Sequence, residues 1–157
     1  MNGKMKSILS NRYIIFISRL VLGSVFIIAS IDKIAAPEAF AANVQAYRLM
    51  PFFLVHIFAL AIPWAELVCG IFLIAGVFIR SSSILLSILL SVFIVAIVSA
   101  LLRGLNIDCG CFGVEHTLPV SWMRVLEDVG LMILGMHIFI FSEPSFLSKN
   151  ILGSKGD

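Results

Sequence analysis

Long apolar stretches alternate with short polar segments along this chain of 157 residues. A helix needs roughly 20 mostly apolar residues to cross the hydrocarbon core of a bilayer, and four stretches meet that requirement. They are apolar on nearly every side, as expected where lipid and neighbouring helices share the surface of a helix. The pattern predicts an all-α membrane protein, a bundle of four transmembrane helices over residues 13–34, 52–79, 83–102 and 120–141.

The polar segments predict how these helices are joined. The run from Arg80 to Ser83 predicts a tight turn between the second and third helices. Pro37 and Pro51 bracket the first connector, in which four apolar side chains recur at helical spacing: Phe40, Val44, Tyr47 and Met50. We therefore expect a short interfacial helix there. Residues 103–119 form the third connector, and residues 1–157 are expected to form a single membrane domain.

The composition supports a lipid environment. Hydrophobic residues make up 61% of the chain and charged residues 13%, whereas soluble domains average about 45–50% and about 25%. A soluble core of this size could not enclose so much apolar surface, and the mean hydropathy is +1.10. The net charge is only +2. Since no basic run or aromatic–basic patch accompanies it, we expect no nucleic-acid partner.

Basic residues predict the orientation, because they concentrate on the cytoplasmic side of membrane proteins. With the N-terminus inside, the inner side would carry Lys4, Lys6, Arg12, Arg80, Lys149 and Lys155. The outer side would carry fewer: Lys33, Arg48 and Arg103, with Arg124 just inside the fourth helix. We therefore expect both termini inside and the third connector outside, in the inner membrane of a bacterial cell. A cleaved signal peptide is a competing interpretation of the first stretch, but the length of that stretch disfavours it.

Ionisable residues within predicted spans are costly and commonly functional. Most of them fall in the outer half of the bundle, and Arg124, Glu127 and Asp128 occupy the first turns of the fourth helix. Glu66 lies near mid-membrane on the second helix, and it is the best candidate for proton exchange because burial favours the neutral form of a carboxyl group. Two interpretations stay open for these charges. They form a polar network that pins the helices together, or a proton path or quinone-headgroup site.

The three cysteines divide into two kinds. Cys69 lies in an apolar stretch and is interpreted as a small hydrophobic residue. Cys109 and Cys111 flank Gly110 in the outer connector, in a compartment that permits disulfides. A ring closed across one residue would be strained and easily reduced, which favours a redox-active dithiol. A structural disulfide and a Cu(I) or Hg(II) site remain as alternatives, whereas zinc is not expected because only His116 is near.

Several short motifs occur in an order and spacing that resemble a known family. They are Arg19-Leu-Val-Leu-Gly23 with Asp32-Lys33, Tyr47-Arg-Leu-Met-Pro51, Pro63-Trp-Ala-Glu66 and Asp108-Cys-Gly-Cys-Phe-Gly113. The first three resemble DoxX-like membrane proteins, and the last resembles the MauE branch, the methylamine utilisation proteins. The resemblance runs from about Arg19 to Asp128, which is most of the chain.

The resemblance implies a four-helix bundle similar in style to the DsbB and VKOR disulfide oxidoreductases. It implies that Cys109 and Cys111 exchange with a thioredoxin-like periplasmic partner and so support maturation of a client such as an amine dehydrogenase. Glu66, Arg19 and Arg124 would line the bundle interior. The DsbB and VKOR proteins use a Cys-x-x-Cys pair and a second pair, whereas this chain has Cys-x-Cys and the single Cys69.

Together, the residues and the resemblance predict a quinone-linked thiol–disulfide oxidoreductase. Its catalytic residues would be Cys109, Cys111 and Glu66. The residues expected at the quinone are Arg19, Arg103, Arg124, Glu127 and Asp128. A non-enzymatic membrane anchor or assembly subunit with a structural disulfide is the alternative, and a soft-metal carrier is the weaker one. No resident metal is expected.

Overall fold

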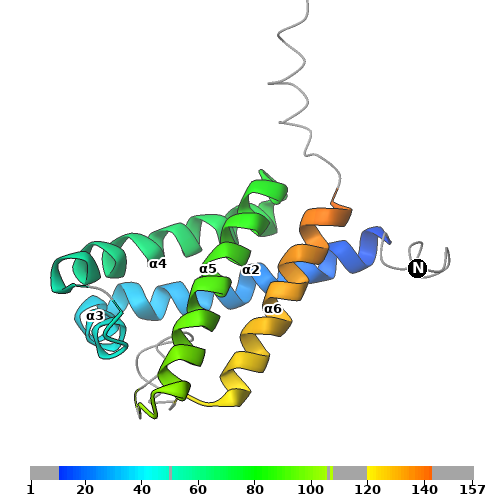
Figure 1. Ribbon diagram of the computed structural model, residues 1–157. Coiled ribbons are helices and arrows are strands. Elements are labelled where there is room, and N and C mark those ends of the chain that lie inside the picture. The colour runs from blue at the N-terminus through cyan, green and yellow to red at the C-terminus, as the bar shows by residue number, and fades with distance from the viewer. Residues whose placement is uncertain (1–10, 50, 106, 108–119, 143–157) are drawn as a thin grey trace, which may run out of the picture.

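The computed structural model describes residues 11–49, 51–105, 107 and 120–142, and the elements in these ranges are helices (Figure 1). They are α2 (Arg12–Ala35), α3 (Pro37–Ala46), α4 (Phe52–Ala75), α5 (Ile79–Leu102) and α6 (Trp122–Phe141). The all-α prediction is confirmed, and the four predicted long helices correspond to α2, α4, α5 and α6. Cys109 and Cys111 lie outside the described residues.

The long helices pack as two antiparallel pairs, α2 with α4 and α5 with α6, and the pairs cross in the view of Figure 1. Pairing of α2 with α4 depends on two glycines. A Cβ atom on Gly70 would lie 3.0 Å from the carbonyl oxygen of Gly23 and 2.9 Å from Cγ1 of Ile27. Only glycine therefore lets the two backbones approach this closely, as small residues do in many membrane helix pairs.

The turn between α4 and α5 lies about four residues earlier than predicted. α4 ends at Ala75, and Gly76 follows with φ 80°, a left-handed conformation that favours glycine. The amides of Gly76 and Val77 both donate to the carbonyl oxygen of Phe72 at 3.0 Å, which closes the helix. The predicted turn from Arg80 to Ser83 was wrong, because these residues lie in the first turns of α5.

Among the described helices, three are long and apolar enough to cross a membrane, namely α2, α4 and α5. Large apolar side chains remain exposed along their outward faces, for example Ile28, Leu60 and Val95. Such surfaces are unfavourable in water, whereas contact with lipid acyl chains leaves them stable. The chain is therefore a membrane protein. α6 packs along α5 but carries Arg124, Glu127 and Asp128 in its first half.

The connector after α2 forms the short helix that the sequence predicts, with Pro37 at its first position. Its apolar face is buried against protein. Phe40 is 1% exposed and packs in a cluster with Val55 and Ala59 of α4, and Tyr47 at the end of the helix is also buried. α3 thus covers the N-terminal half of α4, while its level relative to the membrane interface stays a prediction.

Candidate functional site

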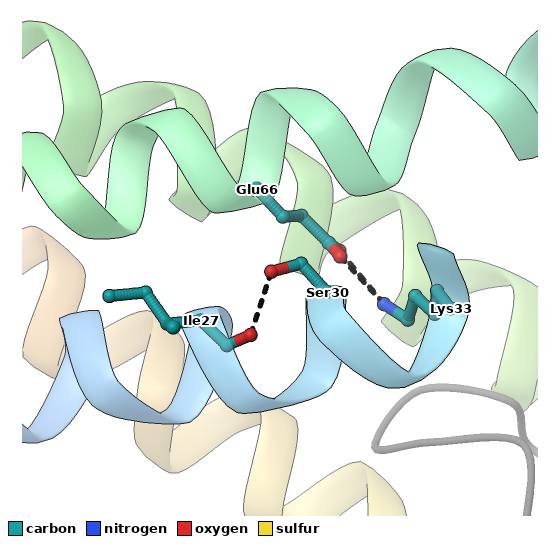
Figure 2. A network of polar contacts seen from close by, with 4 residues as sticks. All are labelled: Ile27, Ser30, Lys33 and Glu66. Atoms are coloured by element: carbon teal, nitrogen blue, oxygen red, sulfur yellow. Dashed lines mark hydrogen bonds and ion pairs between the residues drawn. The ribbon is translucent and has the colours of Figure 1, made fainter. Parts of the chain in front are cut away.

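A buried ion pair links α2 to α4. Nζ of Lys33 donates to both carboxylate oxygens of Glu66, at 2.8 and 3.0 Å, and each side chain is 1% exposed (Figure 2). Lys33 lies ten residues beyond Gly23 on α2, and Glu66 lies four residues before Gly70 on α4. Measured from the level at which the two glycines meet, the backbone of Lys33 is therefore about six residues, or roughly 9 Å, farther along the helix axes than that of Glu66. Helical side chains tilt towards the N-terminus of their own helix. In an antiparallel pair, Lys33 and Glu66 therefore tilt towards each other.

Asp128 of α6 completes a triad with this pair. It is 1% exposed, it lines the same small cavity as Lys33 and Glu66, and the charges of both act on it. Its Oδ2 atom has no hydrogen-bond partner among the described residues. We call Lys33, Glu66 and Asp128 the buried triad. It joins α2, α4 and α6 through one cation and two carboxyl groups.

Two aromatic rings flank the lysine of the buried triad. The Nζ atom of Lys33 lies 5.2 Å from the ring centre of Phe40 and 5.1 Å from that of Phe93. A cation at this distance is attracted by the face of an aromatic ring, and the attraction strengthens when water is excluded. The rings also fix the position of the ammonium group, since Phe40 and Phe93 belong to α3 and α5. The four long helices and the short helix α3 thus all contribute residues to the buried triad or to the rings that flank it.

The remaining wall of the cavity is apolar. It is formed by Val25, Phe26, Ala29 and Leu90, together with Phe93 and the triad. The cavity has room for about 10 Å³, close to the minimum for a single water molecule. A quinone ring does not fit in it. The buried triad can therefore hold or pass a proton, while a larger ligand needs another surface.

A mainly apolar layer separates the buried triad from Ile107 and Val120, the described residues on either side of the segment that carries Cys109 and Cys111. It consists of the buried residues Tyr47, Ile97, Ala100 and Val120. Phe93 at the triad and Ala100 in this layer are seven residues apart on α5, which is about 10 Å of helix. Beyond the layer, the amide of Val120 donates to the carbonyl oxygen of Ile107 at 2.9 Å and ties the two ends of the loop together.

Tyr47 connects this layer to the triad. Burial raises the pKa of its phenol, and ionisation of the nearby Asp128 would raise it further. The phenol therefore stays protonated at neutral pH. Its carbonyl oxygen accepts a hydrogen bond of 2.9 Å from Nη1 of Arg103, so the end of α3 is held to the end of α5.

The predicted arginines lie apart from the buried triad. Arg19 donates from Nε to the carbonyl oxygen of Leu73 at 2.8 Å and from Nη2 to that of Ile74 at 3.4 Å. Arg19 and Arg103 thus each bind the free carbonyl groups at the C-terminal end of another helix, where a cation is favoured. Assignment of the two arginines to a cofactor stays a prediction.

The sequence spacing predicts that Arg124 pairs with both Glu127 and Asp128 on one helix face. In the structure Arg124 pairs with Glu127, near the surface. Together with Val25, Gly130 and Leu131 they line an open groove between α2 and α6. Asp128, next to Glu127 in sequence, points the other way into the bundle. The three predicted charges of α6 are therefore split between a surface groove and the buried triad.

Lys33 is the site residue that the sequence interpretation missed as a partner of Glu66. It lies near the end of α2, and the sequence predicts only a charge at the outer end of the first helix. A signal was present in its spacing, because Leu22, Phe26, Ala29 and Lys33 recur on one helical face, and all four are buried. A cation that continues an apolar stripe predicts a buried partner of opposite charge.

The described part of the chain offers no metal centre, because no group of His, Cys, Asp and Glu side chains in it is placed to hold an ion. Cys69 is buried in the apolar core with Leu73 and Leu86, as expected for a small hydrophobic residue. These features define the class: a small helical membrane protein whose helices meet at a buried ionic triad, with two cysteines in the sequence between α5 and α6.

A family model described as Methylamine utilisation protein MauE matches residues 11–141. The chain therefore belongs to the MauE family. Its curated relatives include the methylamine utilization protein MauE of Paracoccus denitrificans, 31% identical over 76% of this chain and 65% of the relative. That of Methylorubrum extorquens is 35% identical over 67% of this chain and 57% of the relative, and that of Methylophilus methylotrophus is 29% identical over 92% and 76%.

The chain spans less than two thirds of the length of the first two of these relatives. No solved structure gave a significant match to the chain.

Proposed function

We propose that this protein is a thiol–disulfide redox protein of the bacterial inner membrane, in which Cys109 and Cys111 exchange electrons with a thioredoxin-like periplasmic partner. The names of its relatives place them in methylamine utilisation. We extend that role to this chain as an accessory to the maturation of a client such as an amine dehydrogenase. The observation that carries the proposal is the sequence Cys109-Gly110-Cys111 between α5 and α6 of a MauE-family membrane protein whose helices meet at a buried ionic triad.

The exchange balances two electrons and two protons. A thiolate of the partner attacks the Cys109–Cys111 disulfide and forms a mixed disulfide, which the second thiol of the partner resolves. The partner is then oxidised to a disulfide, and Cys109 and Cys111 are reduced to two thiols. A quinone held by the protein would supply the oxidant: the dithiol would give up two electrons and two protons, which would reduce the quinone to a quinol and restore the disulfide. The relative reduction potentials set the direction, and the reverse sequence would carry reducing power outward.

The groove between α2 and α6 is our proposed place for the quinone. It is open at the protein surface, apolar at Val25 and Leu131, and bordered by the charged pair of Arg124 and Glu127. A quinone is an amphipathic ring with two carbonyl oxygens, so an arginine at the edge of an apolar groove would suit it. Asp128 lies on the next position of the same helix, facing inward, and Glu66 lies beyond it. A proton could therefore reach the groove from the buried triad.

The topology that this function needs has four spans, with both termini inside. α6 is proposed as the fourth span because it packs along α5, which is a candidate span in its own right. Its 20 residues would cover about 30 Å, the thickness of the hydrocarbon core. In this proposed topology Cys109 and Cys111 would lie on the periplasmic side, where disulfides persist.

Trapping of thiols in living cells tests the proposal. Cells that produce the chain are quenched with acid, and free thiols are labelled with an alkylating mass tag before and after exposure to a reductant or an oxidant. We expect Cys109 and Cys111 to change state together, whereas Cys69 remains a thiol throughout. The Cys69→Ser variant is the matched control and should keep the response. A pair that stays oxidised under every condition, in cells whose function survives Cys109→Ser, would refute the exchange.

A second candidate is a non-enzymatic membrane anchor or assembly subunit, with the disulfide shaping a docking loop. It is favoured by Arg19 and Arg103, which are engaged on helix carbonyl groups. Recovery of a stoichiometric partner that survives Cys109→Ser would support this role over exchange. The weaker third candidate, a soft-metal carrier, predicts Cu(I) bound per chain after purification under reducing conditions.

A further inference from the structure

The charges of the buried triad do not cancel. Lys33 contributes one positive charge, while Glu66 and Asp128 offer two negative ones, and all three side chains are 1% exposed. Both oxygens of Glu66 are engaged by Nζ of Lys33. Asp128 keeps an oxygen, Oδ2, that is buried and without a partner among the described residues.

No other cation is placed to neutralise Asp128 within the described part of the chain. From α2, Lys33 is the charged residue that lines the same cavity. The neighbouring hydroxyl of Ser30 donates to the carbonyl oxygen of Ile27 (Figure 2). α5 presents the apolar side chains of Leu90 and Phe93. The end of α3 brings the protonated phenol of Tyr47 near it.

On α6 itself, the nearest cation is already engaged. The charges of Arg124 and Glu127 both act on Asp128, but these two side chains are paired with each other near the surface. Their charges act on Asp128 in opposite directions. The excess of one negative charge in the buried triad therefore stands, and water cannot screen it.

We infer that the buried triad holds one exchangeable proton, shared between Glu66 and Asp128, and that Lys33 selects which of the two is ionised. An isolated buried carboxylate takes up a proton rather than remain charged without compensation. In the arrangement observed here, Glu66 is the carboxylate because Lys33 binds both its oxygens, and Asp128 is the acid. Movement of the ammonium group to Asp128 transfers the proton to Glu66.

The flexible four-carbon stem of lysine suits such a change of partner, since its ammonium group has three rotatable donors. The cavity beside the triad has space for about one water molecule, which would carry the proton between the two carboxyl groups. In the redox cycle proposed above, on which this role alone depends, the triad accepts and releases the protons that accompany electron transfer. The proton site itself depends only on Lys33, Glu66 and Asp128.

Infrared difference spectroscopy of the full chain in lipid vesicles tests the inference. At neutral pH we expect a carbonyl stretch of a protonated carboxylic acid, shifted to lower frequency in D2O. Asp128→Asn should abolish this band. Glu38→Gln, a change of an exposed carboxyl group on α3, is the matched control and should leave the band in place. A wild-type spectrum without the band, or a band that persists in Asp128→Asn, would overturn the inference.

Glu66→Gln separates a shared proton from one that Asp128 holds alone. In this variant Asp128 is the single carboxyl group left for Lys33, so it should ionise and the band should also disappear. Retention of the band in Glu66→Gln would overturn the role of Lys33. The double variant Cys109→Ser/Cys111→Ser should retain the band, so failure of the proton site and failure of the thiol exchange give different results. Circular dichroism of each variant confirms that it keeps its helices.

Discussion

Replacement of Lys33 by methionine should destabilise the bundle by about 3 kcal/mol. The change keeps the volume and apolar stem of the side chain but removes the ammonium group and its two hydrogen bonds to Glu66. Loss of one partner from a buried ion pair costs about 3–5 kcal/mol, because the other charge stays buried and uncompensated. We expect the lower end of this range, since the two carboxyl groups can take up protons instead of remaining charged.

Unfolding in mixed micelles with increasing dodecyl sulfate, followed by circular dichroism, measures this free energy. Glu127→Gln is the control, because it breaks an ion pair whose glutamate is 40% exposed and whose loss should cost less than about 1 kcal/mol. The double variant Lys33→Met/Glu66→Leu should recover most of the loss, since a buried pair replaced by apolar residues is commonly neutral. Equal costs for Lys33→Met and Glu127→Gln, or strict additivity in the double variant, would refute the reasoning.

Three further changes probe the fold around the triad. Gly70→Ala should cost about 1–3 kcal/mol through overpacking, whereas Gly130→Ala, whose added Cβ meets nothing within 4 Å, should be neutral or stabilise by up to about 1 kcal/mol; the same micelle titration measures both. Arg19→Gln should cost about 1–3 kcal/mol, because it removes charged hydrogen bonds from the end of α4, and amide exchange should accelerate there. Phe93→Leu should cost about 0.5–2 kcal/mol through its lost contact with the ammonium group, and a cost that Lys33→Met leaves unchanged would contradict that contact.

The long helices could be predicted from the sequence because each is an apolar run of spanning length. The residues at which the helices end are harder to predict from the sequence. Hydrophobicity continues without interruption from α4 through Val77 to Ile79, so the turn at Gly76 is marked only by a glycine in a left-handed conformation. The serines after Arg80 look like a turn in sequence, yet the hydroxyl of Ser83 bonds back to the carbonyl oxygen of Arg80 within α5. A local pattern does not distinguish these two uses of serine.

The sequence identifies the buried charged residues but does not predict which of them pair with each other. Glu66 stands out in any apolar helix, whereas its pairing with Lys33 depends on how α2 and α4 are aligned, which Gly23 and Gly70 set across a long sequence separation. Asp128 and Glu127 are adjacent and look equivalent in sequence. The rotation of α6 sends one into the bundle and the other to the surface. Pairwise alignment and helix rotation are tertiary properties, so neither follows from the charges alone.

A redox titration of Cys109 and Cys111 tests the central claim most directly. The purified chain with Cys69→Ser is equilibrated in buffers of stepped thiol–disulfide potential, labelled with an alkylating mass tag, and weighed by mass spectrometry. We predict a single two-electron transition at a potential above about −300 mV, in the range of exchanging pairs, with both cysteines changing together. A pair that stays oxidised below about −300 mV, as structural disulfides do, or that never forms a disulfide, would contradict the account.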